Sequence, residues 1–199
     1  MAKYSQTIEN LMAQFGKLPG IGARSAERLA FYILRASDLE ANALADAIRD
    51  VKTKIRPCKQ CFNIAEGELC AVCSDPRRDK STICVVEQPK DLLALESTGA
   101  YQGLYHVLLG HIAPLEGVEA EDLTIDSLVD RVKAGGVSEV ILATNPTVAG
   151  DSTGLRISAE IERLGVKVTR LARGLPTGGQ IEYASKSILT DAITDRRKV

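Results

Sequence analysis

Four cysteines in one short segment constrain the fold of this chain more than any other feature. They lie in CKQCFNIAEGELCAVC, where two Cys-x2-Cys pairs are separated by eight residues. Each pair can direct two thiolates toward one centre, and Zn²⁺ takes four sulfur ligands in a tetrahedron at about 2.3 Å. Eight residues, with Gly67 near their middle, suffice for a hairpin that joins the pairs. The spacing therefore predicts one structural zinc ion held by Cys58, Cys61, Cys70 and Cys73.

Paired disulfides, an iron–sulfur cluster and free thiols are the alternatives to zinc. The cysteine count is odd, and the first residues, MAKYSQTIENLMAQ, lack the apolar core of a signal peptide. Both observations argue against a disulfide scaffold, and together with the absence of a long apolar run they predict a cytoplasmic protein that does not enter a membrane. The fifth cysteine, Cys84, lies in the apolar stretch TICVVE, where we expect a small buried side chain.

Apolar residues at helical spacing predict three helices before the cysteines. The first covers residues 5–16 and the second about 23–35, and the third begins at Ser37, where Glu40 completes a capping box. We expect the second helix to be buried along Ala26, Leu29, Ala30, Ile33 and Leu34. The third helix is expected to bury a face that comprises Leu44, Ala47, Ile48, Val51 and Ile55.

The stretch LPGIGARSAERLA joins the first two helices through a tight turn. Gly20 and Gly22 have no side chains to cover the backbone, so its N–H groups and the start of the next helix can approach a phosphate. Arg24 and Arg28 are four residues apart on one face of that helix, and Lys17 precedes the turn. This arrangement resembles a helix–hairpin–helix element, which would bind nucleic acid without reading its sequence. The alternative is a glycine-containing turn in a helical bundle that carries surface arginines.

From residue 81 the sequence alternates between apolar, β-branched stretches and amphipathic ones. This alternation is typical of a parallel sheet covered on both faces, with helices near 89–98, 122–134 and 152–164. We expect Asp151 or Ser152 to cap the last of these helices. The predicted strands are Thr82–Glu87, Leu104–Leu109, Glu139–Thr144 and Val166–Leu171.

This α/β part resembles a Toprim domain, which is shared by topoisomerases, bacterial primases and several DNA-repair proteins. In active members a Glu ends the first strand, and an Asp-x-Asp-x-x-Gly motif follows a later strand. Glu87 matches the first feature, whereas Asn145 and Thr147 replace the two aspartates in a stretch that ends at Gly150. Because Mg²⁺ is held mainly by carboxylates and water, we expect a domain that is not catalytic. The alternative is a Mg²⁺-dependent nuclease or topoisomerase-like enzyme that uses Glu87 and Asp151.

The order of these parts resembles that of the RecR family of bacterial recombination mediators. The resemblance spans essentially the whole chain and includes LPGIGARSAERLAF, the four cysteines, SDPRRD, TICVVE and EVILATNPTVAGD. It implies an α+β multidomain protein that is not an enzyme. The implied parts are a helix–hairpin–helix region over 1–56, a zinc finger over 57–75, a Toprim-type domain over 81–172 and a C-terminal oligomerisation segment, a Gly-rich loop and helix, over 173–199.

The resemblance also implies a role in DNA recombination and repair. Members of the family form a ring-like homotetramer and act with RecO, and often RecF, to load RecA on gapped single-stranded DNA. Carried over to this chain, Arg24 and Arg28 would contact DNA, with Lys17 as a further candidate. Glu87 and Asp91 would contact a basic partner. A zinc-stabilised protein-interaction module without direct DNA contact is the remaining alternative.

Two other features are expected to carry no chemistry. The acidic run from Glu116 to Asp130 is interpreted as a solvated helix and the loop that approaches it. His106 and His111 are interpreted as structural, because the sequence offers neither residue a catalytic Ser or Cys partner.

Overall fold

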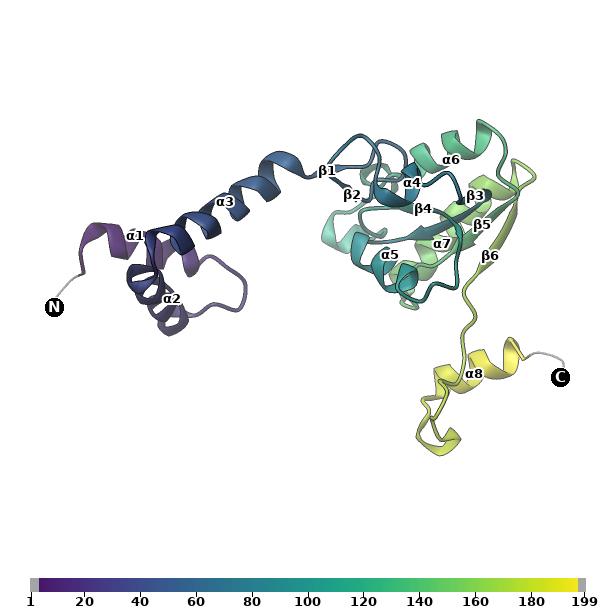
Figure 1. Cartoon of the computed structure of the whole chain (residues 1–199). Helices are drawn as coiled ribbons and strands as arrows, with labels where there is room; N and C mark the ends of the chain where they lie inside the picture. The colour runs from purple at the N-terminus through teal and green to yellow at the C-terminus, as the bar shows by residue number, and fades with distance from the viewer. Residues whose placement is uncertain (1–3, 197–199) are drawn as a thin grey trace. The chain divides into compact units, whose positions relative to one another are not determined.

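The computed structural model describes residues 4–196 of the chain. It divides after Ile55 into two compact units, which are considered separately below (Figure 1). Among the described residues, no helix has the length and apolar character that are needed to cross a membrane.

The first unit consists of three helices, as predicted: α1 (Gln6–Phe15), α2 (Ala23–Arg35) and α3 (Asp38–Lys54). Helices α1 and α2 pack together, and the α2 residues that are fully buried are the small Ala26 and Ala30. The predicted capping box at the start of α3 is present, since Glu40 N donates to Ser37 Oγ and Ser37 N donates to Glu40 Oε2.

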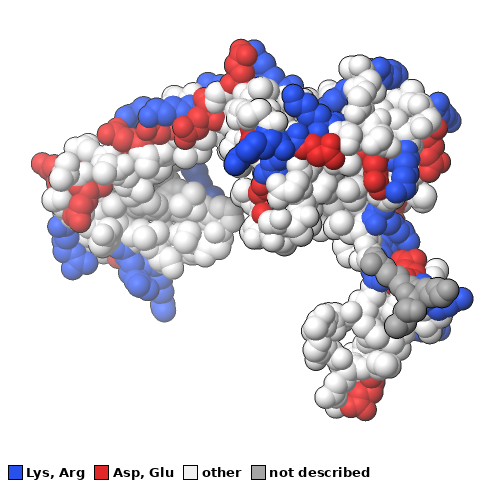
Figure 2. Space-filling model, turned by 45° about the vertical axis from the view of Figure 1, so that its right-hand side comes forward, with Lys and Arg blue, Asp and Glu red and all other residues white. Residues whose placement is uncertain are grey.

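The apolar face of α3 is exposed, so the predicted burial of this face is wrong for the single chain. Ile48 and Val51 are 60% and 61% exposed, and Leu44 is also exposed. Leu29 and Leu34 of α2, which were predicted to be buried, are likewise exposed. The helical period identifies an apolar face but not the surface that covers it. In Figure 2, charged side chains are scattered over this unit between broad uncharged areas.

The second unit begins with the cysteine segment. Strand β1 (Arg56–Pro57) pairs antiparallel with β2 (Ile64–Ala65), and the short helix α4 (Ala71–Ser74) follows. This hairpin encloses the first cysteine pair, whereas the sequence predicted a hairpin between the two pairs, so that expectation is wrong in its position.

A parallel four-stranded sheet forms the rest of this unit's core, as predicted. Its strands are ordered β4 (Gly103–Val107), β3 (Asp79–Val86), β5 (Glu139–Leu142) and β6 (Lys167–Arg170). Cys84 on the central strand β3 is buried, as expected. Burial raises the pKa of its thiol to about 12.

Helices cover the two faces of this sheet. They are α5 (Pro89–Glu96), α6 (Ile125–Lys133) and α7 (Val148–Glu162). Right-handed crossovers place α5 on one face and α6 and α7 on the other, because the chain steps from β3 to β4 in one direction and returns to β5 and β6 in the other. Helices α6 and α7 contact each other. The fully buried side chains between these layers include Ile83, Val85, Leu92, Tyr105, Leu128, Val140, Ile157 and Ile161.

The chain ends with the Gly-rich loop and a short helix, α8 (Lys186–Thr194), as predicted. Ser185 caps α8 through its hydroxyl, which accepts from Ile188 N. A 3₁₀ turn over Ile181–Tyr183 precedes it. Ile181, Tyr183 and Ile193 are largely exposed, so this segment presents an uncovered apolar surface.

Candidate functional site

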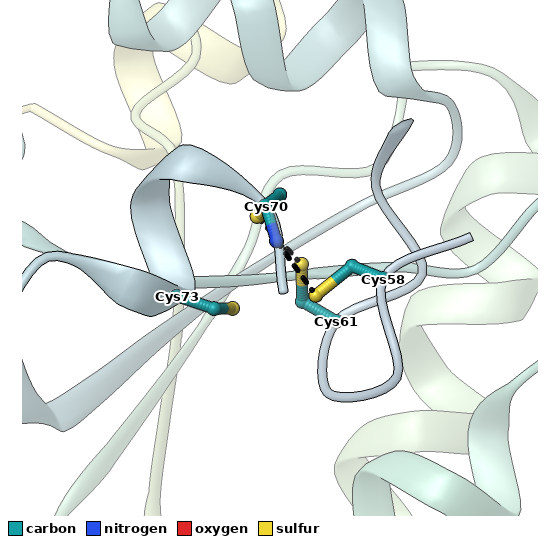
Figure 3. A group of neighbouring side chains, drawn as sticks. All are labelled: Cys58, Cys61, Cys70 and Cys73. Atoms are coloured by element: carbon teal, nitrogen blue, oxygen red, sulfur yellow. Dashed lines mark hydrogen bonds between the residues drawn. The ribbon is translucent and has the colours of Figure 1, made fainter. Parts of the chain in front are cut away.

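The four cysteines converge on one centre. Cys58, Cys61, Cys70 and Cys73 place their sulfur atoms within 4.8 Å of one another, and Figure 3 shows the four side chains directed into one small volume. The Sγ atoms of Cys61 and Cys70 are 3.5 Å apart. Around a tetrahedral ion with sulfur ligands at about 2.3 Å, the sulfur atoms lie roughly 3.8 Å apart. The donor set and its spacing therefore fit a structural metal ion.

Backbone hydrogen bonds shape the loops that carry these thiols. Cys58 N donates to Asn63 O at 2.7 Å and Phe62 N donates to Cys58 O at 3.0 Å, which closes the first pair into a tight turn. Cys70 N donates to Cys58 Sγ at 3.3 Å, so one N–H already points at a ligand sulfur. Hydrogen bonding among the thiols lowers the pKa of Cys70 and raises the pKa of Cys61. Metal binding deprotonates such ligands, so formation of the site and loss of thiol protons are coupled.

The cysteine segment is attached directly to the sheet. Val107 N, on edge strand β4, donates to Cys61 O at 2.8 Å. The Phe62 ring meets the His106 ring edge-on, with centroids 5.4 Å apart. His106 is fully buried, and its Nε2 lies 2.9 Å from Thr124 O and Thr124 Oγ1. The cysteine segment thus covers one edge of the sheet, where a strand would otherwise have free backbone groups, and a metal ion held by the four thiols would support that edge.

In the first unit, the backbone of the glycine turn and the basic side chains near it are exposed to solvent. Gly20 has φ +78°, a conformation that favours glycine, and Gly22 precedes α2 without a side-chain cap. Arg24 and Arg28 are both exposed on the first turns of α2. Within residues 4–196, neither guanidinium has a hydrogen-bond or ion-pair partner. Lys17 is exposed as well, and its Nζ donates to Gln14 Oε1 at 3.2 Å.

At the carboxyl edge of the sheet, Glu87 is buried and bound by Asn145. Only 3% of Glu87 is exposed. Asn145 N donates to Glu87 Oε1 and Asn145 Nδ2 donates to Glu87 Oε2, both at 2.7 Å. His111 Nδ1 lies 3.2 Å from the same Oε2. The residue that replaces an acid of the Toprim motif therefore supplies two donors to the remaining Glu. Sequence reasoning identified the replacement and missed this pairing, because the two residues are far apart in the chain.

The turn after β5 is built from the other replacements. Thr147 caps α7, since its Oγ1 accepts from Gly150 N at 3.0 Å. The expected cap at Asp151 or Ser152 is wrong, because α7 begins at Val148. An Asn-x-Thr stretch before an apolar helix already contained this signal.

Asp151 instead forms a bidentate ion pair with Arg173, in which Arg173 Nη1 donates to Asp151 Oδ2 at 3.0 Å and Arg173 Nη2 donates to Asp151 Oδ1. Hydrogen bonding by Arg173 lowers the pKa of Asp151. The two acids that a Mg²⁺-dependent enzyme would use are thus each engaged by another side chain.

Asp91, the second predicted partner-binding acid, is half-buried at the start of α5. Its Oδ2 accepts from Gln88 N at 2.9 Å, so the carboxylate takes part in capping the helix. With Glu87 buried and Asp91 engaged, direct contact of these carboxylates with a protein partner stays a prediction.

A hollow of about 700 Å³ lies beside the edge strand β6. Leu142, Leu155 and Val168 supply apolar walls, and the Asp151–Arg173 pair lies at its margin. A hollow of this size accommodates apolar side chains of another segment. Sequence reasoning had no signal for it, because its lining comes from three separate elements.

Comparison with known proteins assigns a family to three parts of the chain. Residues 8–52 match the helix–hairpin–helix family of RecR, residues 55–75 match the four-cysteine zinc-finger domain of RecR, and residues 81–172 match the Toprim domain. Two proteins called "Recombination protein RecR" are similar over all or nearly all of their length. The one from Rhodopirellula baltica is 54% identical over 100% of both chains, and the one from Chloroflexus aurantiacus is 55% identical over 96% of this chain and 94% of its own.

These similarities extend through the glycine turn, the four-cysteine centre and the parallel sheet, whose carboxyl edge has Asn145 and Thr147 in place of two aspartates. The metal centre is accordingly that of a four-cysteine zinc-finger domain. By sequence identity over its full length and by the order of its domains, this chain belongs to the RecR family of recombination proteins.

Proposed function

We propose that this protein is a non-catalytic mediator of recombination in DNA repair, which binds DNA through its helix–hairpin–helix region and acts as a ring-like clamp. The observation that carries the proposal is the pair of exposed, unpartnered arginines, Arg24 and Arg28, beside a bare glycine turn. The N-terminus of α2 adds free N–H groups, which favour a phosphate. Such contacts bind the nucleic-acid backbone and are independent of base sequence.

The test is DNA binding as a function of salt. Each phosphate contact contributes about 0.9 to the slope of log affinity against log salt for duplex DNA, and about 0.7 for a single strand. The double variant Arg24→Ala/Arg28→Ala should therefore lose up to about 1.8 from the duplex slope and bind more weakly. Arg35→Ala is the matched control, because Arg35 lies at the far end of the same helix and donates to Phe31 O. An unchanged slope in the double variant would exclude the hairpin as the DNA contact.

The same proposal includes assembly into a homotetramer. A closed tetramer with dihedral symmetry needs two different self-complementary interfaces. Two uncovered apolar surfaces lie in separate parts of the described residues, the α3 face with Ile48 and Val51 and the C-terminal segment with Ile181 and Ile193. We infer that the α3 face of one copy packs against the α3 face of a second copy. We also infer that the C-terminal segment packs on a neighbouring copy, where it binds in the hollow beside β6.

Native mass spectrometry with and without DNA tests the assembly. Ile48→Ser/Val51→Ser should reduce the tetramer to dimers, because polar side chains remove the apolar contact. Ile193→Ser should also yield dimers, through loss of the other interface. A tetramer that persists in both variants would refute the assignment of these two surfaces.

We further propose that the bound metal is zinc and that the protein acts with RecO and RecF to load RecA on gapped DNA. The all-thiolate donor set and the family relationship support zinc. Lys17, Gly20 and Gly22 are proposed to assist Arg24 and Arg28 at the DNA. The partner contacts are assigned to the Toprim-type domain, which includes Glu87 and Asp91.

The enzymatic alternative has a direct test. Supercoiled and nicked DNA incubated with the protein and Mg²⁺ should remain intact, because Glu87 and Asp151 are held by Asn145 and Arg173. Cleavage that disappears in a Glu87→Gln variant would establish a Toprim nuclease instead.

A further inference from the structure

A rigid loop between β4 and α6 presents a fully exposed leucine. Leu115 lies in the 3₁₀ turn Pro114–Glu116, at the tip of a small hairpin. Ala113 N donates to Val118 O at 2.9 Å and Val118 N donates to Ala113 O at 3.1 Å, which closes that hairpin. The tip is therefore held in one conformation while its apolar side chain contacts only solvent.

Both ends of the loop are fixed to the sheet edge. His111 Nδ1 lies 3.2 Å from Glu87 Oε2, and Ile112 N donates to Thr153 Oγ1 of α7 at 2.9 Å. At the other end, Thr124 Oγ1 donates to Val107 O at 2.8 Å. The loop thus needs little ordering when a partner binds, which lowers the entropic cost of association.

Two further apolar side chains are exposed along the same edge. Leu109 closely follows β4 and Val148 begins α7 just after β5, and these strands flank β3. Val148 is 87% exposed and Leu109 is 45% exposed. The topology therefore places Leu109, Leu115 and Val148 around the carboxyl edge, where α/β proteins bind their ligands.

The loop side of this edge carries negative charge, whereas Arg173 lies on the side of β6. The chain has no Lys or Arg from residue 91 to residue 130, and that stretch contains eight Asp and Glu. Glu116, Glu119 and Glu121 lie next to the apolar tip and are exposed. Within residues 4–196, no Lys or Arg forms an ion pair with any of these three. Such a surface repels DNA and attracts a cationic protein segment.

We propose that this edge surface, formed by Leu109, Leu115, Val148, Glu116, Glu119 and Glu121, binds a cationic amphipathic helix of a partner protein. The inference rests on the proposed function, in which the Toprim-type domain contacts protein partners, and it moves the contact from the engaged Glu87 and Asp91 to the loop around them. Leu115 would enter the apolar stripe of the bound helix. The three glutamates would meet its flanking Lys and Arg side chains.

The probe is a fluorescently labelled synthetic helix with Leu along one face and Lys on the other, titrated with the full chain and read by anisotropy. Leu115→Ser should weaken binding at least tenfold, because an exposed leucine that is buried in the complex contributes that much or more. Glu116→Lys should weaken binding several-fold, with the loss diminishing at high salt. The matched controls are Leu93→Ser and Glu66→Lys, which change exposed residues elsewhere in the same unit and should stay within twofold of the wild type.

Three results would contradict the proposed binding at the edge surface: no saturable binding of the helix, equal losses of affinity in variants and controls, or a changed oligomeric state in Leu115→Ser. The last result would make the loop an interface between copies of the chain. Each of these leaves the Arg24 and Arg28 salt experiment untouched, so failure of the inference is distinguishable from failure of the proposed function. Retained DNA binding by Leu115→Ser together with weakened peptide binding is the expected combination.

Discussion

Two glycines of α7 provide a sharp test of how closely the sheet edge is packed. Gly150 lies in the first turn of α7, and Gly154 lies one turn later on the same helix. A Cβ at Gly150 would lie far inside contact distance of Asn145 O and 2.8 Å from Glu87 Oε1. A Cβ at Gly154 would meet Leu142 Cδ1 and Thr144 Oγ1 at 3.5 Å, which is ordinary van der Waals contact. The same substitution should therefore have opposite effects at the two sites.

The magnitudes follow from these contacts. Alanine in a helix interior is favoured over glycine by up to about 1 kcal/mol, so Gly154→Ala should raise the free energy of unfolding by that amount or less. Gly150→Ala must displace the Asn145 carbonyl, which is backbone and cannot rotate away. Overpacking of this kind costs about 1–3 kcal/mol, and weakening of the two Asn145–Glu87 hydrogen bonds adds to it. The expected net loss is about 3 kcal/mol.

Thermal unfolding followed by far-ultraviolet circular dichroism measures both variants, since the chain has no tryptophan for fluorescence. For a unit of this size, about 3 kcal/mol corresponds to a midpoint lowered by roughly 6–12 °C. Gly154→Ala should unfold at the wild-type temperature or slightly above it. Faster amide exchange in the first turn of α7 should accompany the loss in Gly150→Ala. A Gly150→Ala midpoint equal to that of Gly154→Ala would refute the account of Asn145 as a packed partner of Glu87.

Three other predictions concern the Glu87 pair, the metal centre and the buried histidine. Asn145→Asp should lower the unfolding midpoint, because two carboxylates then face each other at the buried Glu87, and millimolar Mg²⁺ should restore part of the loss. Elemental analysis should find one zinc per chain in the wild type and in Cys84→Ser, and none in Cys61→Ser, because only the latter removes a ligand. Burial lowers the pKa of His106 to about 4, so the unfolded state binds a proton more readily below its own pKa of about 6.5. Between pH 7.5 and pH 5, the free energy of unfolding should therefore fall by about 2 kcal/mol more in the wild type than in His106→Gln. Chemical denaturation measures this difference.

Local sequence signals predicted most of the elements. The glycine turn, the Ser37 capping box and the paired cysteines each depend on residues close together in the chain. The parallel sheet was predictable because apolar, β-branched stretches alternate with helical ones along the chain. In all these cases the interaction that determines the structure is local, or it repeats along the chain.

The features that the sequence did not predict depend instead on contacts that are not local in the chain. The α3 stripe with Ile48 and Val51 has the period of a buried helix face, but the single chain supplies no surface to cover it. The pairing of Glu87 with Asn145 joins residues 58 positions apart, and nothing near either one indicates it. Asp151 has a plausible local role as a cap, yet a long-range partner, Arg173, and an earlier start of α7 override that role.

The Glu87–Asn145 pair also explains how a Toprim-type edge can persist without the acids that hold a cation. An unpaired buried carboxylate is costly, so loss of the aspartates alone would leave Glu87 destabilising. Asn145 removes that cost with two neutral donors at 2.7 Å, and His111 adds a third contact from the neighbouring loop. The edge becomes satisfied by its own side chains and rigid in the absence of any ion. What remains available for binding is then the exposed apolar and acidic rim around it, which suits a protein segment better than a phosphodiester.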